Sequence, residues 1–203
     1  MYEAVHAHPD GQSTVARFAK TAADYGFEGV VVRNHDDARA EYDPERIRDE
    51  YGIDVVAGIE IRADDRQQAS GAVGNYRPSE TIVAVHGGTN AMNRFAVEQP
   101  KVDVLAHPLA GDGDINHVLV KAAVENGVRL EFDLSRALRQ SGGQRVRALQ
   151  SLRKMREIVA HYDAPYVVSA DPTAHLEVRA PRELTALGEQ IGVSSEFVEK
   201  GLA

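Results

Sequence analysis

Several histidines and acidic residues of this sequence follow directly after short apolar stretches. Neutral imidazoles and carboxylates bind divalent cations in proteins, and a bound cation can activate water for the hydrolysis of a phosphoester. If the apolar stretches are parallel strands of one barrel, their carboxyl ends meet at one rim, and these side chains converge there. The residues in question are His6, His8, His35, Glu60, His86, His107, Asp171 and His175.

Two interpretations of this set remain open at the level of sequence. Polar residues are common at the rim of a barrel without any ion, so in the main interpretation the chain binds no cofactor firmly. The chain has no cysteine, which excludes thiolate ligands and thiolate nucleophiles. In the alternative interpretation a divalent zinc, manganese or iron ion is bound by oxygen and nitrogen ligands, namely His6, His8, His35, Glu60, His107 and Asp171.

A second set of residues is basic. Between Asp133 and Glu157 there is no acidic residue, and the seven basic ones give this segment a charge of +7. The whole chain has a net charge of −8, so the remaining residues carry −15. A local basic surface neutralises phosphates, and the forked guanidinium suits their oxygens. Two further arginines flank the start of a later predicted helix, where free backbone N–H groups favour an anion. The predicted RNA- or partner-binding residues are Arg136, Arg139, Arg145, Arg147, Arg153, Lys154, Arg156, Arg179 and Arg182. The alternative is a solvated helix face paired with acidic neighbours.

The composition predicts one soluble domain. A chain of 203 residues with 43% hydrophobic content can bury one core of the α/β barrel type, and we draw no domain boundary within residues 1–203. The apolar runs have the length of strands, and no signal peptide is visible, so we expect a cytoplasmic protein without a membrane partner. High acidity with little lysine is typical of proteins from a salt-rich cytoplasm.

Residues 102–138 contain the clearest structural unit, on which the prediction of the fold depends. Two short apolar stretches, 102–106 and 128–132, are predicted to be buried parallel strands. Between them, Ile115, Leu119 and Ala123 recur at helical spacing, with Asp114 as the predicted N-cap and Gly127 as the predicted stop. This is a strand, helix, strand unit.

The rest of the chain repeats the same alternation. We predict further strands over residues 2–6, 27–32, 53–59, 81–85 and 165–169. Predicted helices begin after Ser13, Asp43, residue 90, Gly143, Ala180 and Ser194, while the polar residues 64–78 form a frayed helix or a loop. The helix that ends near Tyr162 is expected to turn Val146, Leu149, Leu152, Met155, Ile158 and Val159 inward. The fold class is therefore α/β, a TIM-barrel-like (βα) barrel of about seven parallel strands, irregular or incomplete.

The rim residues resemble those of the polymerase-and-histidinol-phosphatase metallohydrolases. That family has a His-x-His after the first strand, a His after the second, a Glu after the third, a later His-Pro and a terminal Asp-x-His. This sequence departs from the pattern at Pro9, where the family has a hydroxyl residue, and at Asp171, which three residues rather than one separate from His175. The resemblance implies a metal-dependent phosphoesterase, which is the alternative function.

A more specific resemblance covers the second half of the chain. The run 102–138 with its INHVLVKAAVENGVRLEFDLS core, the basic helix, the Val-Ser-Ala strand end and VRAPRELTALGEQIGV are similar to protein component 3 of archaeal ribonuclease P, the thirty-kilodalton subunit family. The resemblance implies a barrel-like subunit that supports RNA-catalysed removal of the 5′ leader from precursor tRNA. Its implied partners are the ribonuclease P RNA, protein component 2 and, through the holoenzyme, precursor tRNA. The isolated chain is then not catalytic, because the RNA holds the active site.

Overall fold

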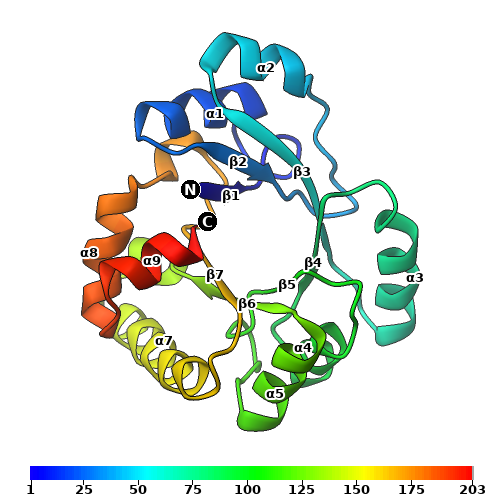
Figure 1. Ribbon diagram of the computed structural model, residues 1–203, viewed down its shortest axis with the longest axis vertical. Helices are drawn as coiled ribbons and strands as arrows, with labels where there is room; N and C mark the ends of the chain where they lie inside the picture. The colour runs from blue at the N-terminus through cyan, green and yellow to red at the C-terminus, as the bar shows by residue number, and fades with distance from the viewer. Residues whose placement is uncertain (203) are drawn as a thin grey trace.

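The computed structural model describes residues 1–202, and its frame is one sheet of seven parallel strands. Each strand pairs with the next in chain order, from β1 to β7, so the sheet curls into a barrel (Figure 1). This confirms the predicted TIM-barrel-like α/β fold. The strands are β1 (Tyr2–Val5), β2 (Gly29–Val32), β3 (Asp54–Ile61), β4 (Ile82–His86), β5 (Val104–Ala106), β6 (Arg129–Asp133) and β7 (Tyr166–Ser169).

The barrel is irregular at the junction of its first and last strands. Within residues 1–202 no ladder of strand pairing joins β7 to β1. The junction is instead bridged by the buried carboxyl group of Glu3, which accepts hydrogen bonds from Ser169 Oγ at 2.7 Å and from the Ala170 N–H at 3.1 Å. The His6 N–H also donates to Pro172 O at 3.1 Å. A side chain thus replaces part of a backbone ladder.

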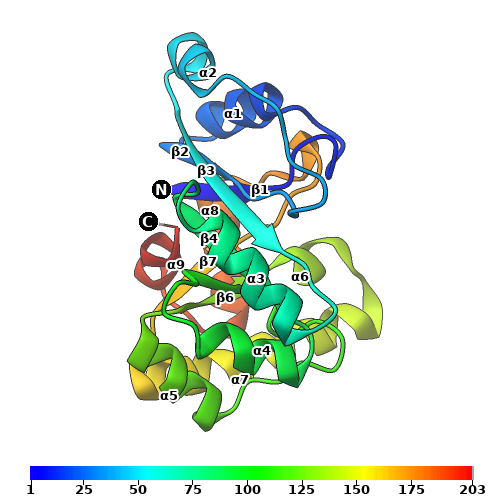
Figure 2. The same cartoon turned by 90° about the vertical axis from the view of Figure 1, so that its right-hand side faces the viewer.

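The helices form an outer ring around the sheet (Figures 1 and 2). Their apolar faces pack on the strands, and the main core includes Phe18, Ile59, Leu105, Leu130 and Leu184. Along residues 1–202 no helix combines the length and the apolar character needed to cross a membrane. The helices are α1 (Val15–Asp24), α2 (Pro44–Tyr51), α3 (Arg66–Tyr76), α4 (Asn90–Val97), α5 (His117–Asn126), α6 (Ser135–Arg139), α7 (Gly142–Tyr162), the 3₁₀ helix η1 (His175–Glu177), α8 (Pro181–Ile191) and α9 (Ser195–Gly201).

Two of the predicted helix caps are wrong by one or two residues. Helix α5 is capped by Asn116, whose side-chain oxygen accepts from the N–H groups of Val118 and Leu119, whereas Asp114 forms an ion pair with Lys154. Helix α1 is capped by Thr14 rather than by Ser13. The predicted stop of α5 at Gly127 is confirmed, since this residue has the left-handed conformation with φ 71°.

Other differences concern the polar segments. Residues 64–78 contain a regular helix, α3, because the Asp65 side chain accepts from the Gln68 N–H and stabilises its first turn. Val146 was expected to face inward but is 52% exposed, because the first turns of α7 project beyond the core and burial begins at Ala148. Helices α6 and η1 were not predicted.

Candidate functional site at the carboxyl ends of the strands

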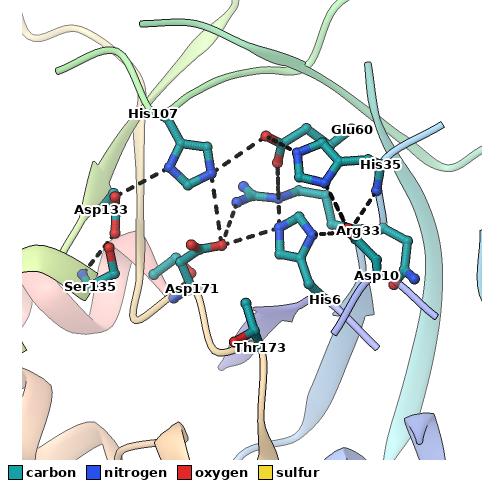
Figure 3. A network of polar contacts seen from close by, with 12 residues as sticks. His6, Asp10, Arg33, His35, Glu60, His107, Asp133, Ser135, Asp171 and Thr173 are labelled. Carbon is teal, nitrogen blue, oxygen red and sulfur yellow. Dashed lines mark hydrogen bonds and ion pairs between the residues drawn. The ribbon is translucent and has the colours of Figure 1, made fainter. Parts of the chain in front are cut away.

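The predicted convergence of side chains at the rim is observed for most of the predicted residues. His6 follows β1, His35 follows β2, Glu60 lies near the end of β3 and His107 follows β5. Asp171 follows β7, and the five side chains point toward one another in Figure 3. His86, the last residue of β4, completes the cluster.

Arg33 occupies the centre of this cluster. Its guanidinium is buried and lies between three carboxylates. Nε is 2.9 Å from Glu60 Oε2 and Nη2 is 3.4 Å from Asp171 Oδ1 (Figure 3). Nη1 is 2.6 Å from Glu131 Oε1. A buried positive charge surrounded in this way compensates the carboxylates that burial would otherwise disfavour. The polar rim is therefore organised around an arginine.

Three of the imidazoles are held by carboxylates on their Nδ1 atoms. Asp10 lies 2.7 Å from His6 Nδ1 and 2.9 Å from His35 Nδ1, and Asp133 lies 3.2 Å from His107 Nδ1. Each bond fixes the plane of its ring and turns Nε2 toward the centre of the cluster. Orientation of imidazoles by outer carboxylates is the arrangement that metal-binding histidines require.

The charges of the cluster shift the pKa values of its members. Burial alone would raise the pKa of Glu60, but the positive charges of Arg33 and His107 outweigh burial and hold it well below its usual value. Burial likewise opposes protonation of His6, yet its hydrogen bonds with Asp10 and Asp171 raise its pKa to about 9. Glu60 is thus ionised, and the proton on His6 balances part of the negative charge.

Two of the predicted rim residues lie outside the cluster. His8 is exposed and contributes to none of the groups of side chains that could hold an ion within residues 1–202. His175 bonds through Nδ1 with Ser13 Oγ at 2.9 Å, so it links η1 to the loop before α1. Neither histidine can join a common site in this conformation.

Sequence reasoning missed Asp10, Arg33 and Glu131 as members of the site. A usable signal existed for two of them. Glu131 lies between the apolar Leu130 and Phe132 of one strand, and Arg33 directly follows another, apolar strand, so each needs a buried partner of opposite charge. Asp10 lies in a loop, where its type and spacing carry no comparable signal.

The predicted RNA- or partner-binding residues fall into two groups. Arg136, Arg145, Arg147 and Arg182 are exposed, and within residues 1–202 the last three have no side-chain hydrogen bond or ion pair. Helix α6 and the chain that leads into α7 lie at the end of the barrel toward which the β3 arrow points (Figure 2). The exposed arginines of α6 and α7 are therefore on the rim side of the barrel.

The other basic side chains bind to the protein itself. Arg139 donates to Ala170 O and Asp171 O, and Arg153 donates twice to Gln190 O, at 3.1 and 2.7 Å. Arg156 donates to Gly192 O at 3.3 Å. The last two therefore satisfy carbonyls at the carboxyl end of α8. Arg179 donates to carbonyls of its own loop, and Lys154 pairs with Asp114.

Comparison with proteins of known structure shows two levels of similarity. A chain of the cryo-EM structure of archaeal ribonuclease P with mature tRNA is 25% identical, with a TM-score of 0.83, and the match covers 100% of this chain and 87% of that one. Histidinol phosphate phosphatase from Lactococcus lactis is 12% identical, with a TM-score of 0.59, and the match covers 94% and 93% of the two chains. The second likeness is one of fold alone.

Comparison of sequences shows to which family this chain belongs. Ribonuclease P protein component 3 of Natronomonas pharaonis is 63% identical over 100% of this chain and 85% of its own length. The same component of Haloarcula marismortui is 62% identical over 100% of this chain and 86% of its own length. Both relatives are from halophilic archaea, in agreement with the salt-adapted composition. Residues 1–203 match the RNase P subunit p30 family, and the chain belongs to this family of ribonuclease P subunits.

Proposed function

We propose that this ribonuclease P subunit contacts the RNA or a protein partner through the exposed arginines of α6 and α7 on the rim side of the barrel, together with that of α8. The observation that carries the proposal is that the side chains of Arg145 and Arg147 are exposed and unpaired within residues 1–202. Both side chains are exposed on the first turns of α7, in a segment without acidic residues, and neither has an ion-pair partner within residues 1–202. Their charge is therefore available to phosphate.

The local backbone adds to this positive potential. The first N–H groups of α7 have no intrahelical acceptor, and Ser141 forms no side-chain cap with them. Such a helix end attracts anions, and forked guanidinium groups beside it can bind phosphate oxygens in pairs. Arg136 on α6 and Arg182 on α8 add further exposed positive charge. The expected ligand is a phosphate backbone, namely that of the ribonuclease P RNA or of precursor tRNA in the holoenzyme.

Within the complex, we infer that this chain supports a reaction that the RNA catalyses, namely the removal of the 5′ leader of precursor tRNA. It does so in the cytoplasm, together with component 2. The isolated chain is not the catalyst. Arg33 lies at the centre of the rim cluster, and its guanidinium charge disfavours two adjacent cations of the kind that a two-metal phosphoesterase uses. Metal-dependent cleavage of precursor tRNA by the chain alone, abolished by Glu60→Ala, would support the phosphoesterase alternative instead.

The double reversal Arg145→Glu with Arg147→Glu tests the proposed surface. Because each lost phosphate contact removes one counterion-release event, the slope of log K against log salt for assembly should fall by about two, and affinity should fall with it. The measurement is titration of the ribonuclease P RNA, with and without component 2, at several salt concentrations. Arg153 stays unchanged because it anchors α8.

The matched control is the double reversal Arg17→Glu with Arg46→Glu. These two arginines are also exposed but lie on α1 and α2, outside the basic segment. Circular dichroism checks that all variants fold. An equal loss of affinity in both pairs, or no loss in either, would mean that the basic segment is only a solvated face.

A further inference from the structure

We propose that the lumen of the barrel, the space that the seven strands enclose, binds one small monocarboxylate with an apolar body. The site lies at the amino ends of the strands, the end away from which the β3 arrow points in Figure 2, and it does not depend on the RNA-facing surface. A cavity of about 270 Å³ occupies this part of the lumen. Since one molecule of liquid water takes about 30 Å³, an organic group of roughly nine heavy atoms has room there.

The wall of the cavity is chiefly apolar. All seven strands contribute side chains to it, which shows that the cavity lies inside the barrel. Most of these side chains are only half-buried although they point inward, so a group of the size of water reaches them. An apolar ligand in contact with this wall removes two apolar surfaces from water at once. The apolar wall residues on the strands include Ala4, Val31, Val56, Ile82, Val104 and Val167.

Small residues leave the lumen unfilled. The inside of a TIM barrel is normally packed by layers of bulky branched side chains. Here Ala84, Val104 and Ala106 form an apolar cluster separate from the main core, and Ile82 and Val167 pack against it. Because two of the three central residues are alanines, the side chains do not meet across the barrel. A ligand in the cavity gains contacts that the protein itself does not supply.

The inner end of the cavity offers no free polar group to a ligand. Arg33 and Glu131 lie there and pair with each other, with Nη1 2.6 Å from Oε1. Glu131 Oε2 accepts from the His107 N–H at 2.9 Å, and the other guanidinium nitrogens of Arg33 face Glu60 and Asp171. Since these groups satisfy one another, the part of the ligand that reaches them must be apolar, and its charged end must lie toward solvent.

Arg129 provides the charge at the outer end. It precedes Glu131 by two positions on β6, so both side chains point to the inner face of the strand. Arg129 lines the cavity and is exposed, and within residues 1–202 its side chain has no hydrogen-bond or ion-pair partner. The neighbouring carboxylate of Asp103 pairs with Arg77 instead. A free guanidinium at the mouth of an apolar cavity favours a carboxylate, whose two oxygens match its fork.

Calorimetric titration of the full chain with octanoate, kept below the concentration at which it forms micelles, tests the site. Octylamine and octanol are probes of the same chain length with a positive charge or none. We expect one octanoate per chain and a negative heat-capacity change, because apolar surface leaves water. Octylamine should bind at least about tenfold more weakly than octanoate, since its ammonium group meets the Arg129 guanidinium.

Three variants locate the ligand. Arg129→Gln should weaken octanoate binding by a factor of about three to ten and leave octanol binding unchanged. Arg17→Gln is the matched control, because Arg17 is also exposed and unpaired within residues 1–202 but lies on α1. It should bind octanoate as the unmodified chain does. Val31→Phe places a ring in the lumen and should abolish the binding of both octanoate and octanol, with circular dichroism as the folding control.

Four results contradict the proposal. They are no octanoate binding by the unmodified chain, equal affinity for octanoate and octylamine, equal effects of Arg129→Gln and Arg17→Gln, and unchanged octanoate binding by a folded Val31→Phe chain. Binding of octanol without octanoate would show an apolar site for an uncharged ligand and would also overturn the carboxylate assignment. If Val31→Phe does not fold, the comparison of Arg129→Gln with Arg17→Gln decides.

Discussion

At the scale of residues, Arg33 determines how the rim can be built. A guanidinium is charged at every pH at which the protein folds, and its three donors in this site face three different carboxylates. It can therefore compensate negative charge on β3, on β6 and after β7 at once. The contacts of Arg33 could not be predicted, because the sequence does not show which buried carboxylates meet this guanidinium when the barrel forms.

Replacing Arg33 should strongly destabilise the fold. Arg33→Met leaves Glu60, Glu131 and Asp171 with uncompensated buried charge, so the free energy of unfolding should fall by about 3 to 5 kcal/mol. Denaturant titration at neutral pH measures the change. Arg48→Met removes an exposed pair with Asp54 and should leave the free energy of unfolding almost unchanged, because solvent screens such a pair. Equal effects of the two substitutions would show that the buried network contributes little.

At the scale of elements, the sequence pattern predicted the seven strands and most helices, since apolar periodicity and cap residues are local signals. Asp43 and Gly127 mark helix ends that the structure confirms. Helix α3 was uncertain because its composition is polar, and only Ala69 and Val73 are buried along it. The choice between Asp114 and Asn116 as a cap could not be made from residue type, because both side chains can cap and the ion pair with Lys154 is a long-range contact.

The packing of α5 gives a direct test of the strand, helix, strand unit. Leu119 lies on the buried face of α5, and Leu119→Ala should lower the free energy of unfolding by about 2 to 5 kcal/mol through lost burial and a remaining cavity. On the opposite face Val124 is 42% exposed, so Val124→Ala should change it by less than about 0.5 kcal/mol. Denaturant midpoints of the two variants provide the comparison, and an unchanged midpoint in Leu119→Ala would contradict the assignment of faces.

At the scale of the whole molecule, the barrel closes through a side chain where β1 and β7 lack a ladder. Glu3 is fully buried at this junction, and its bonds to Ser169 and Ala170 join the first strand to the last. Burial is the largest influence on this carboxyl group and, together with the negative charges of Asp171 and Glu131, it raises the pKa of Glu3 to about 8 despite the two hydrogen bonds. The stability of the junction between β1 and β7 therefore depends on whether Glu3 carries its proton.

This coupling predicts a pH dependence of stability whose sign follows from the direction of the shift. In the unfolded chain Glu3 ionises near its ordinary pKa of 4.5, whereas in the folded chain it keeps its proton up to about pH 8. Between these values the unfolded state binds fewer protons, so the stabilising contribution is fully present below pH 4.5 and is lost as the pH rises toward 8, by at most about 1.4 kcal/mol per pH unit. Glu3→Gln keeps the shape and an acceptor for the Ala170 N–H but cannot ionise. Its free energy of unfolding should therefore fall less steeply than that of the unmodified chain between pH 5 and 8, as urea titrations across this range can measure. Parallel curves for the two proteins would mean that the Glu3 carboxyl group ionises at the junction without weakening it.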